Sequence, residues 1–172
     1  MSTGTGSLKY EIQQKKPFPN VRHEALLGLL KTSDLVRRAA SSVVEPAGIT
    51  MQQYNVLRIL RGAGAEPLPT LEIRSRMIEQ TPGITRLLDK LEKSGWVTRN
   101  RSNDDRRQIL CGISVRGKKL LDDLDASIDA VPEQLFADIP DHEAKVLVSV
   151  LDKIRATQFE EVQPRDDANS AA

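Results

Sequence analysis

Arginine and lysine side chains gather in two short stretches near the middle of the chain. Arg86 and Lys90 are four residues apart, and further arginines occupy positions 99, 101, 106 and 107. Guanidinium and ammonium groups bind phosphate oxygens, and arginine also pairs with the edge of guanine. These residues can hold a phosphate-bearing partner if the fold turns them toward the same side.

The first stretch lies on a predicted helix that begins at Thr81, a good N-cap, and continues with Pro82, which suits the first helical position. Its apolar residues form one stripe at helical spacing: Ile84, Leu87, Leu88 and Leu91. Its polar side carries Thr85, Arg86, Asp89, Lys90 and Lys93. Such a helix can enter the major groove of B-DNA, where its N-terminal side chains reach base edges. A surface helix with solvated charges is the alternative.

The second stretch is a polar loop, 101–107, between two predicted strands, 96–99 and 109–113. Arginine on a narrow loop suits the minor groove, where the potential is most negative. Asp105 adds a negative charge here, and we expect its carboxylate to hold an arginine and fix the loop. A merely solvated hairpin is the alternative. The candidate DNA-binding residues are Gln80, Thr81, Thr85, Arg86, Lys90, Arg99, Arg101, Asp105, Arg106 and Arg107.

The elements around these two stretches are predicted to be helices. The predicted helices are 21–44, a segment capped by Thr50, a short segment from Thr70, the segment from Thr81, 115–131, and a last segment from Asp141. Pro46 ends the first of them, and we expect Pro132 to break or kink the helix at 115–131. The predicted fold is mainly α with a small β-hairpin wing: a winged helix-turn-helix lobe on a helical body.

Charge is distributed unevenly along the 172 residues. The net charge is +1, but residues 70–119 hold 12 basic and 6 acidic residues, while residues 120–172 hold 4 basic and 13 acidic residues. A basic middle next to an acidic C-terminal part suits a molecule with one face that meets phosphate. A chance fluctuation in solvated surface charge is the alternative.

The residues that could support an enzyme are few and scattered. The chain has two histidines, His23 and His142, and one cysteine, Cys111, which excludes an internal disulfide. We interpret the histidines as surface or capping residues and Cys111 as a small apolar filler. We expect no catalytic site, no metal and no cofactor. No run reaches the roughly 18 apolar residues of a membrane span, so we expect a cytoplasmic protein without membrane contact.

Residues 50 to about 122 resemble the MarR family of bacterial regulators. The resemblance rests on three stretches of sequence: Ile49–Leu57, Thr85–Val97, and an Asp-x-Arg wing signature at Asp105–Arg107 followed by the junction Ile113–Gly117. It implies a sequence-specific regulator of transcription, a repressor in most relatives, that binds double-stranded DNA. It also implies that Arg107 contacts the minor groove. Many relatives are released by a small aromatic ligand, which is the candidate effector here.

The resemblance also implies a homodimer whose terminal helices interlock. The long helices carry more apolar surface than a small winged lobe can cover, which supports a partner, and two-fold symmetry predicts a palindromic operator. The expected regions are an N-terminal arm (1–20), a helical dimerisation region (21–48 and 115–160), a DNA-binding lobe (49–114) and a disordered tail (161–172). A winged helix used only for protein–protein contact is the alternative function.

Overall fold

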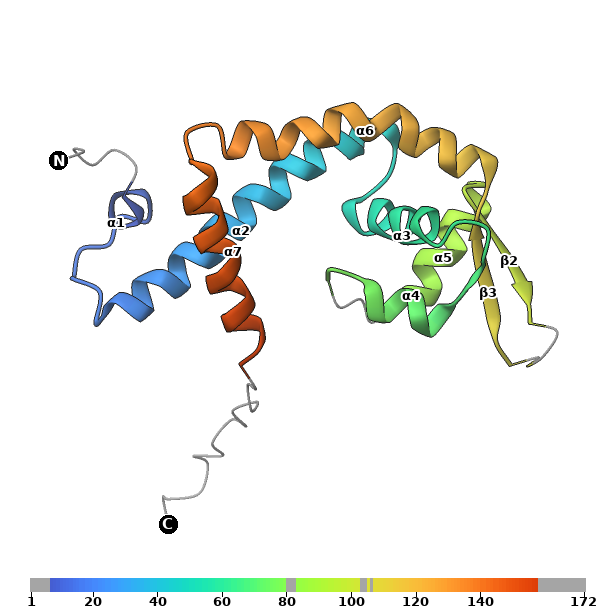
Figure 1. The fold of residues 1–172 in the computed structure, drawn as a ribbon, viewed down its shortest axis with the longest axis horizontal. Helices are drawn as coiled ribbons and strands as arrows, with labels where there is room; N and C mark the ends of the chain where they lie inside the picture. Colours follow the sequence, from blue (N-terminus) through green and yellow to red (C-terminus); the bar gives the residue numbers. More distant parts are fainter. Residues whose placement is uncertain (1–6, 80–82, 103–104, 106, 158–172) are drawn as a thin grey trace, which may run out of the picture. The chain divides into compact units, whose positions relative to one another are not determined.

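The computed structural model describes residues 7–79, 83–102, 105 and 107–157, which form helices and one small antiparallel sheet (Figure 1). The chain divides into two compact units, 1–132 and 133–172, which are described separately. The elements are α1 (Leu8–Glu11), α2 (Val21–Val44), a 3-10 turn (Glu45–Ala47), α3 (Met51–Gly62), β1 (Leu68–Pro69), α4 (Thr70–Arg76), α5 (Ile84–Lys93), β2 (Val97–Arg101), β3 (Ile109–Ile113), α6 (Val115–Leu135) and α7 (Asp141–Arg155).

Local capping sets the ends of α2 and α3. The Asn20 side chain accepts a hydrogen bond from the His23 amide at 3.0 Å and starts α2. Thr50 and Gln53 form a reciprocal capping box at the start of α3, with distances of 2.9 and 3.2 Å. The predicted helix over 21–44 and the predicted cap at Thr50 are both confirmed.

A single apolar core lies in the first unit, where α3, α4 and α5 are side by side next to the sheet (Figure 1). The stripe residues of α5 face inward: Leu88 and Leu91 are fully buried and Ile84 is 7% exposed. The α3 residues Val56 and Leu57 are fully buried in the same cluster. Burial of these side chains is the main force that fixes α5 on the lobe.

The sheet has three strands in the order β1-β3-β2, all antiparallel. Sequence analysis predicted the β2–β3 hairpin but not β1, a two-residue strand in which Leu68 pairs with Cys111. The hairpin is tied to α6 through Ser114, whose hydroxyl donates to the Gly95 carbonyl at 2.7 Å and accepts from the Gly117 amide at 3.0 Å. A Cβ at Gly117 would lie 2.3 Å from the Trp96 carbonyl oxygen, so glycine permits this close approach.

Two predicted helix ends differ from the structure. The helix expected to begin at Thr81 begins at Ile84, with Gly83 as an N-cap that makes no side-chain hydrogen bond; Thr81 and Pro82 lie outside the described residues. The helix predicted over 115–131 was also expected to break at Pro132. It does not end there, because α6 continues to Leu135. Pro132 is exposed, so water can bond the carbonyl that lacks its amide partner, and the helix tolerates the loss.

The second unit consists mainly of α7, which has no buried residue. A turn with an Ile139 amide to Phe136 carbonyl bond of 2.9 Å precedes it. Large apolar side chains remain exposed along it: Val146, Leu147, Val148, Val150 and Ile154.

Candidate nucleic-acid interface

Helix α5 presents a polar face to solvent. Thr85, Arg86, Lys90 and Lys93 are all exposed, on the side opposite the buried leucines. Asp89 is half-buried next to them. The N-terminal turn, which carries Thr85 and Arg86, is the part of such a helix that reaches base edges in the major groove. Gln80 and Thr81, the other predicted contacts of this helix, lie outside the described residues.

The segment that leads into α5 is held by side chains of α3. The Asn55 side-chain oxygen accepts a hydrogen bond from the Ile78 amide at 3.0 Å. The Gln52 amide group donates to the Glu79 carboxylate at 3.2 Å. Neither Asn55 nor Gln52 was among the residues predicted from the sequence to shape the interface. Both side chains hold the segment that directly follows α4, at Ile78 and Glu79.

A small hydrogen-bond network around Asp105 connects the described residues of the wing between β2 and β3. Its carboxylate accepts from the Arg107 amide at 2.9 Å, its own amide donates to Ser102 Oγ at 3.3 Å, and its carbonyl accepts from the Gln108 amide at 2.9 Å. The Ser102 amide in turn donates to the Gln108 carbonyl at 3.0 Å. The carboxylate thus binds the backbone of an arginine, where we had expected its guanidinium. Arg101 and Arg107 point into solvent, and Arg106 lies outside the described residues.

Arg99 does not share the exposure of the other predicted contacts. Its side chain is only 12% exposed. Its guanidinium forms an ion pair with Asp89 and lies 3.4 Å from the Glu92 carboxylate, both on α5. Burial acts to lower the pKa of Arg99, but the hydrogen bond and the charge of Asp89 outweigh it and raise the pKa, so the group stays charged. Arg99 therefore connects strand β2 to α5.

The exposed cations of this face have no acidic partners among the described residues. No ion pair there involves Arg86, Lys90, Lys93, Arg101 or Arg107, whereas Asp89 and Glu92 both pair with Arg99. Cations without a local partner keep their charge available for phosphate. The surface formed by these five residues on α5 and the wing is called the basic face below.

The residues considered for catalysis lie on three different elements: His23 on α2, Cys111 on β3 and His142 on α7. Cys111 is fully buried on β3, and burial raises the pKa of its thiol, an effect that its contacts with Thr70 and Arg99 only reduce. A protonated thiol is a poor nucleophile at neutral pH. Within the described residues, no group of three or more His, Cys, Asp and Glu side chains is arranged to hold a metal ion. None of the helices in this part of the chain is long and apolar enough to span a membrane.

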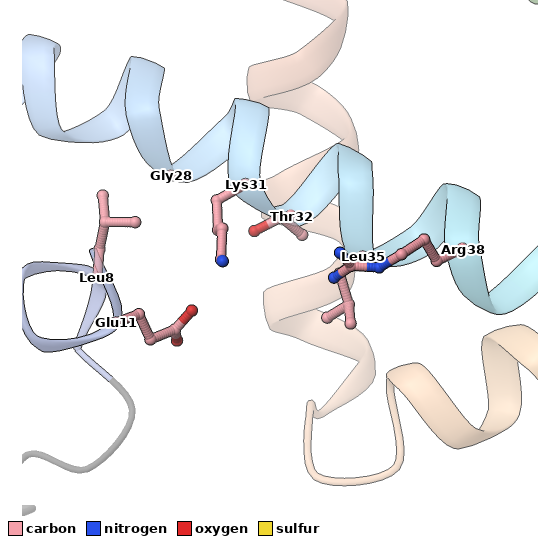
Figure 2. A pocket seen from close by; sticks show the side chains of 7 residues that line it. All are labelled: Leu8, Glu11, Gly28, Lys31, Thr32, Leu35 and Arg38. Carbon is pink, nitrogen blue, oxygen red and sulfur yellow. The ribbon is translucent and has the colours of Figure 1, made fainter.

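A groove lies between α1 and α2. Its volume is about 330 Å³, and its apolar walls include Leu8 and Leu35. Figure 2 shows Leu8 and Glu11 of α1 facing Lys31 of α2 across the groove. Arg38 lines the far end, 2.8 Å from the Asp34 carboxylate. The volume falls within the range of pockets for small molecules.

Comparison with known proteins places these features in one family. Residues 49–109 match the model of the MarR family. The chain is 30% identical over 113 residues to the uncharacterized HTH-type transcriptional regulator YwoH of Bacillus subtilis, covering 66% of this chain and 80% of that protein.

Solved structures agree with this match. A MarR transcription factor from Planctomyces limnophilus is 31% identical, with a TM-score of 0.62, and the match covers 80% of this chain and 99% of that one. CouR from Rhodococcus jostii RHA1, solved with bound p-coumaroyl-CoA, is 27% identical with a TM-score of 0.68, over 84% of this chain and 100% of that one. The chain belongs to the MarR family, and it is a DNA-binding regulator of transcription that acts as a homodimer.

Proposed function

We propose that the basic face is the surface that reads a double-stranded operator. Helix α5 enters the major groove, where Thr85, Arg86 and Lys90 meet base edges and phosphates. The wing reaches the neighbouring minor groove with Arg101 and Arg107. Gln80, Thr81 and Arg106, which flank these residues in sequence, stay predictions as further contacts.

One observation supports this proposal: cations from two separate elements are exposed and have no ion pair within the described residues, while Asp89 and Glu92 on α5 pair with Arg99. A solvated surface of the ordinary kind pairs or intersperses its charges. A protein–protein module has no need for arginines on a wing. The other predicted contacts, Arg99 and Asp105, act in this proposal as supports that shape α5 and the wing.

Two regions of the chain have separate roles in this proposal, DNA binding and dimerisation. Residues 49–114 form the DNA-binding lobe, and residues 21–48 with 115–160 form the dimerisation region. Exposed apolar side chains on α2 and α7 support this assignment, since each helix needs a partner surface. Two lobes related by two-fold symmetry read a palindromic operator. Residues 1–20 and 161–172 remain proposed as an arm and a tail.

The regulator acts in this proposal as a repressor in the cytoplasm, without enzymatic activity, and a small aromatic ligand releases it from DNA. A dimer bound over a promoter excludes polymerase, which makes repression the direct consequence of binding. The p-coumaroyl-CoA bound to CouR carries an aromatic group and supports a ligand of that class. The groove between α1 and α2 has the volume of a pocket for a small aromatic molecule, with Lys31 available for a carboxylate.

The test is operator affinity of Arg86→Ala, measured on operator and scrambled duplex at one salt concentration. We expect binding to the operator to weaken by about 1–3 kcal/mol, and the preference for operator over scrambled DNA to shrink, because a base contact is lost. Lys145→Ala on α7 is the matched control, an exposed cation outside the basic face. Unchanged affinity in Arg86→Ala would remove α5 from the reading surface.

A further inference from the structure

Arg99 lies in the DNA-binding lobe, but its side chain is not available to DNA. Given the proposed reading surface, we infer that Arg99 is a positioning residue: by holding the carboxylates of Asp89 and Glu92, it keeps the cations of α5 free for phosphate and bases. It does this from inside the lobe, between β2 and α5. The inference rests on the proposed function and assigns a role that the exposed residues do not fill.

The strand geometry places Arg99 on the inner face of the sheet. Side chains alternate along β2, so Arg99 shares a face with Val97, which is 3% exposed. Its cross-strand partner is Cys111, which is fully buried. The Nε atom is buried and has no hydrogen-bond partner within the described residues. A guanidinium in this position reaches phosphate only by abandoning both carboxylates, so we exclude a direct contact.

The spacing on α5 explains why the carboxylates must be held. Asp89 lies three residues after Arg86 and four residues before Lys93. Acid–base pairs at these spacings attract one another on a helix surface. Asp89 is nonetheless paired with Arg99, and neither Arg86 nor Lys93 has an ion pair within the described residues. Without Arg99, the free carboxylate of Asp89 competes with DNA for those two side chains.

The test is a double-mutant cycle with Arg99→Met, Asp89→Asn and the double variant, measured as operator affinity and as its dependence on salt. Arg99→Met is expected to weaken binding by about tenfold and to lower the salt slope by about one, because Asp89 then pairs with a DNA-contacting cation. Asp89→Asn alone should change affinity by less than about twofold, since that carboxylate is already neutralised. In the double variant the affinity is expected to return to within about threefold of the starting protein, and the salt slope with it.

A direct contact between Arg99 and phosphate would give a different result in this cycle. If Arg99 touches phosphate, Asp89→Asn changes affinity by the same factor in both backgrounds, and the salt slope stays low in the double variant. Melting curves show whether each variant is folded. If Arg99→Met is not, Arg99→Gln, which also lacks the positive charge, replaces it, and Asp89→Asn must then still have a larger effect on affinity than in the starting protein. A failed cycle with a normal Arg86→Ala effect overturns this inference alone, whereas an Arg86→Ala variant without effect overturns the proposed reading surface.

Discussion

The DNA-binding lobe buries its large apolar side chains, whereas the terminal helices leave theirs exposed. In the lobe, the large apolar residues of α3 and α5 that face inward are at most 7% exposed. On α2, the leucines at 26, 29, 30 and 35 are 39–60% exposed, and on α7 the residues Leu147, Val150 and Ile154 are 40–50% exposed. Both regions are amphipathic helices by sequence, so the pattern of residues does not explain the difference.

The difference shows which part of the molecule can cover its apolar side chains within one chain. The lobe closes its own core because α3, α4 and β2 all pack against α5. The long helices α2 and α7 also have an apolar side, but its large side chains stay exposed in the single chain. Because the protein acts as a homodimer, we assign this uncovered surface to the second copy. Stability of the lobe should therefore depend on its own packing, and function of the whole protein on assembly.

The largest expected effect comes from substitutions on α7 that place charge in the proposed dimer surface. Leu147→Glu with Ile154→Glu puts two carboxylates on one face, and two-fold symmetry doubles the number. Each lost apolar contact costs about 1.5–3 kcal/mol, so we expect monomers at micromolar concentration and operator affinity reduced by at least about 100-fold. Light scattering and a DNA titration measure the two quantities.

A control for this variant lies on the same helix. Ser149 is exposed and points away from the face of Leu147, so Ser149→Glu should leave the dimer intact. A double variant that stays dimeric would show that α7 does not form the interface, and the contrast between the two regions would then have another cause.

The second prediction concerns the core of the lobe. Leu88→Ala removes a fully buried side chain from α5 and leaves a cavity, so we expect unfolding to become easier by about 2–5 kcal/mol. The dimer should survive, because Leu88 is fully buried on α5 and is not part of the exposed apolar surface of α2 and α7. Denaturant unfolding at fixed protein concentration gives the stability, and light scattering gives the assembly state.

Leu71 provides the comparison for Leu88 within the same lobe. Its side chain on α4 is 74% exposed, so Leu71→Ala should change stability by less than about 0.5 kcal/mol. Equal losses in both variants, or loss of the dimer in Leu88→Ala, would contradict the view that the lobe is held by its own core.

The sequence predicted the long helices well because their ends are local events. Asn20 and Thr50 cap with side chains a few residues away, and Gly48 adopts φ +78° just after α2. Strand β1 was missed because two residues carry no period, and it forms only because β3 offers an edge. The continuation of α6 past Pro132 was missed because proline alone predicts a stop and says nothing about exposure.

The site was predicted less completely than the fold, and Arg99 shows why. A cluster of arginines indicates phosphate binding, but it does not say which members point inward. The signal was present in the alternation of β2, which puts Arg99 on the face of Val97. What could not be read from the sequence is that Asp89 and Glu92 lie across from that face, because their contact with β2 depends on how α5 packs on the sheet.

The smallest effect is expected in the wing, where charge and shape make opposite predictions. Arg107→Ala removes a cation from the basic face, so affinity should fall and the salt slope should become shallower by roughly one phosphate equivalent. Asp105→Ala removes a negative charge, and Coulomb attraction alone predicts tighter binding. We expect weaker binding instead, because the carboxylate holds the Arg107 amide at 2.9 Å and the loop must otherwise be ordered when it meets DNA.

Asp105→Asn separates the two causes, since it removes the charge and keeps a side-chain oxygen that can accept the Arg107 amide. If shape dominates, Asn should bind DNA at least as well as the starting protein, while Ala binds several-fold more weakly, by about 1 kcal/mol for the lost hydrogen bond and loop order. If charge dominates, both substitutions should tighten binding by a similar factor that shrinks as salt rises. A salt titration of the three variants on one operator duplex decides between them, and tighter binding by Asp105→Ala at every salt concentration would show that Asp105 is only a repulsive surface charge.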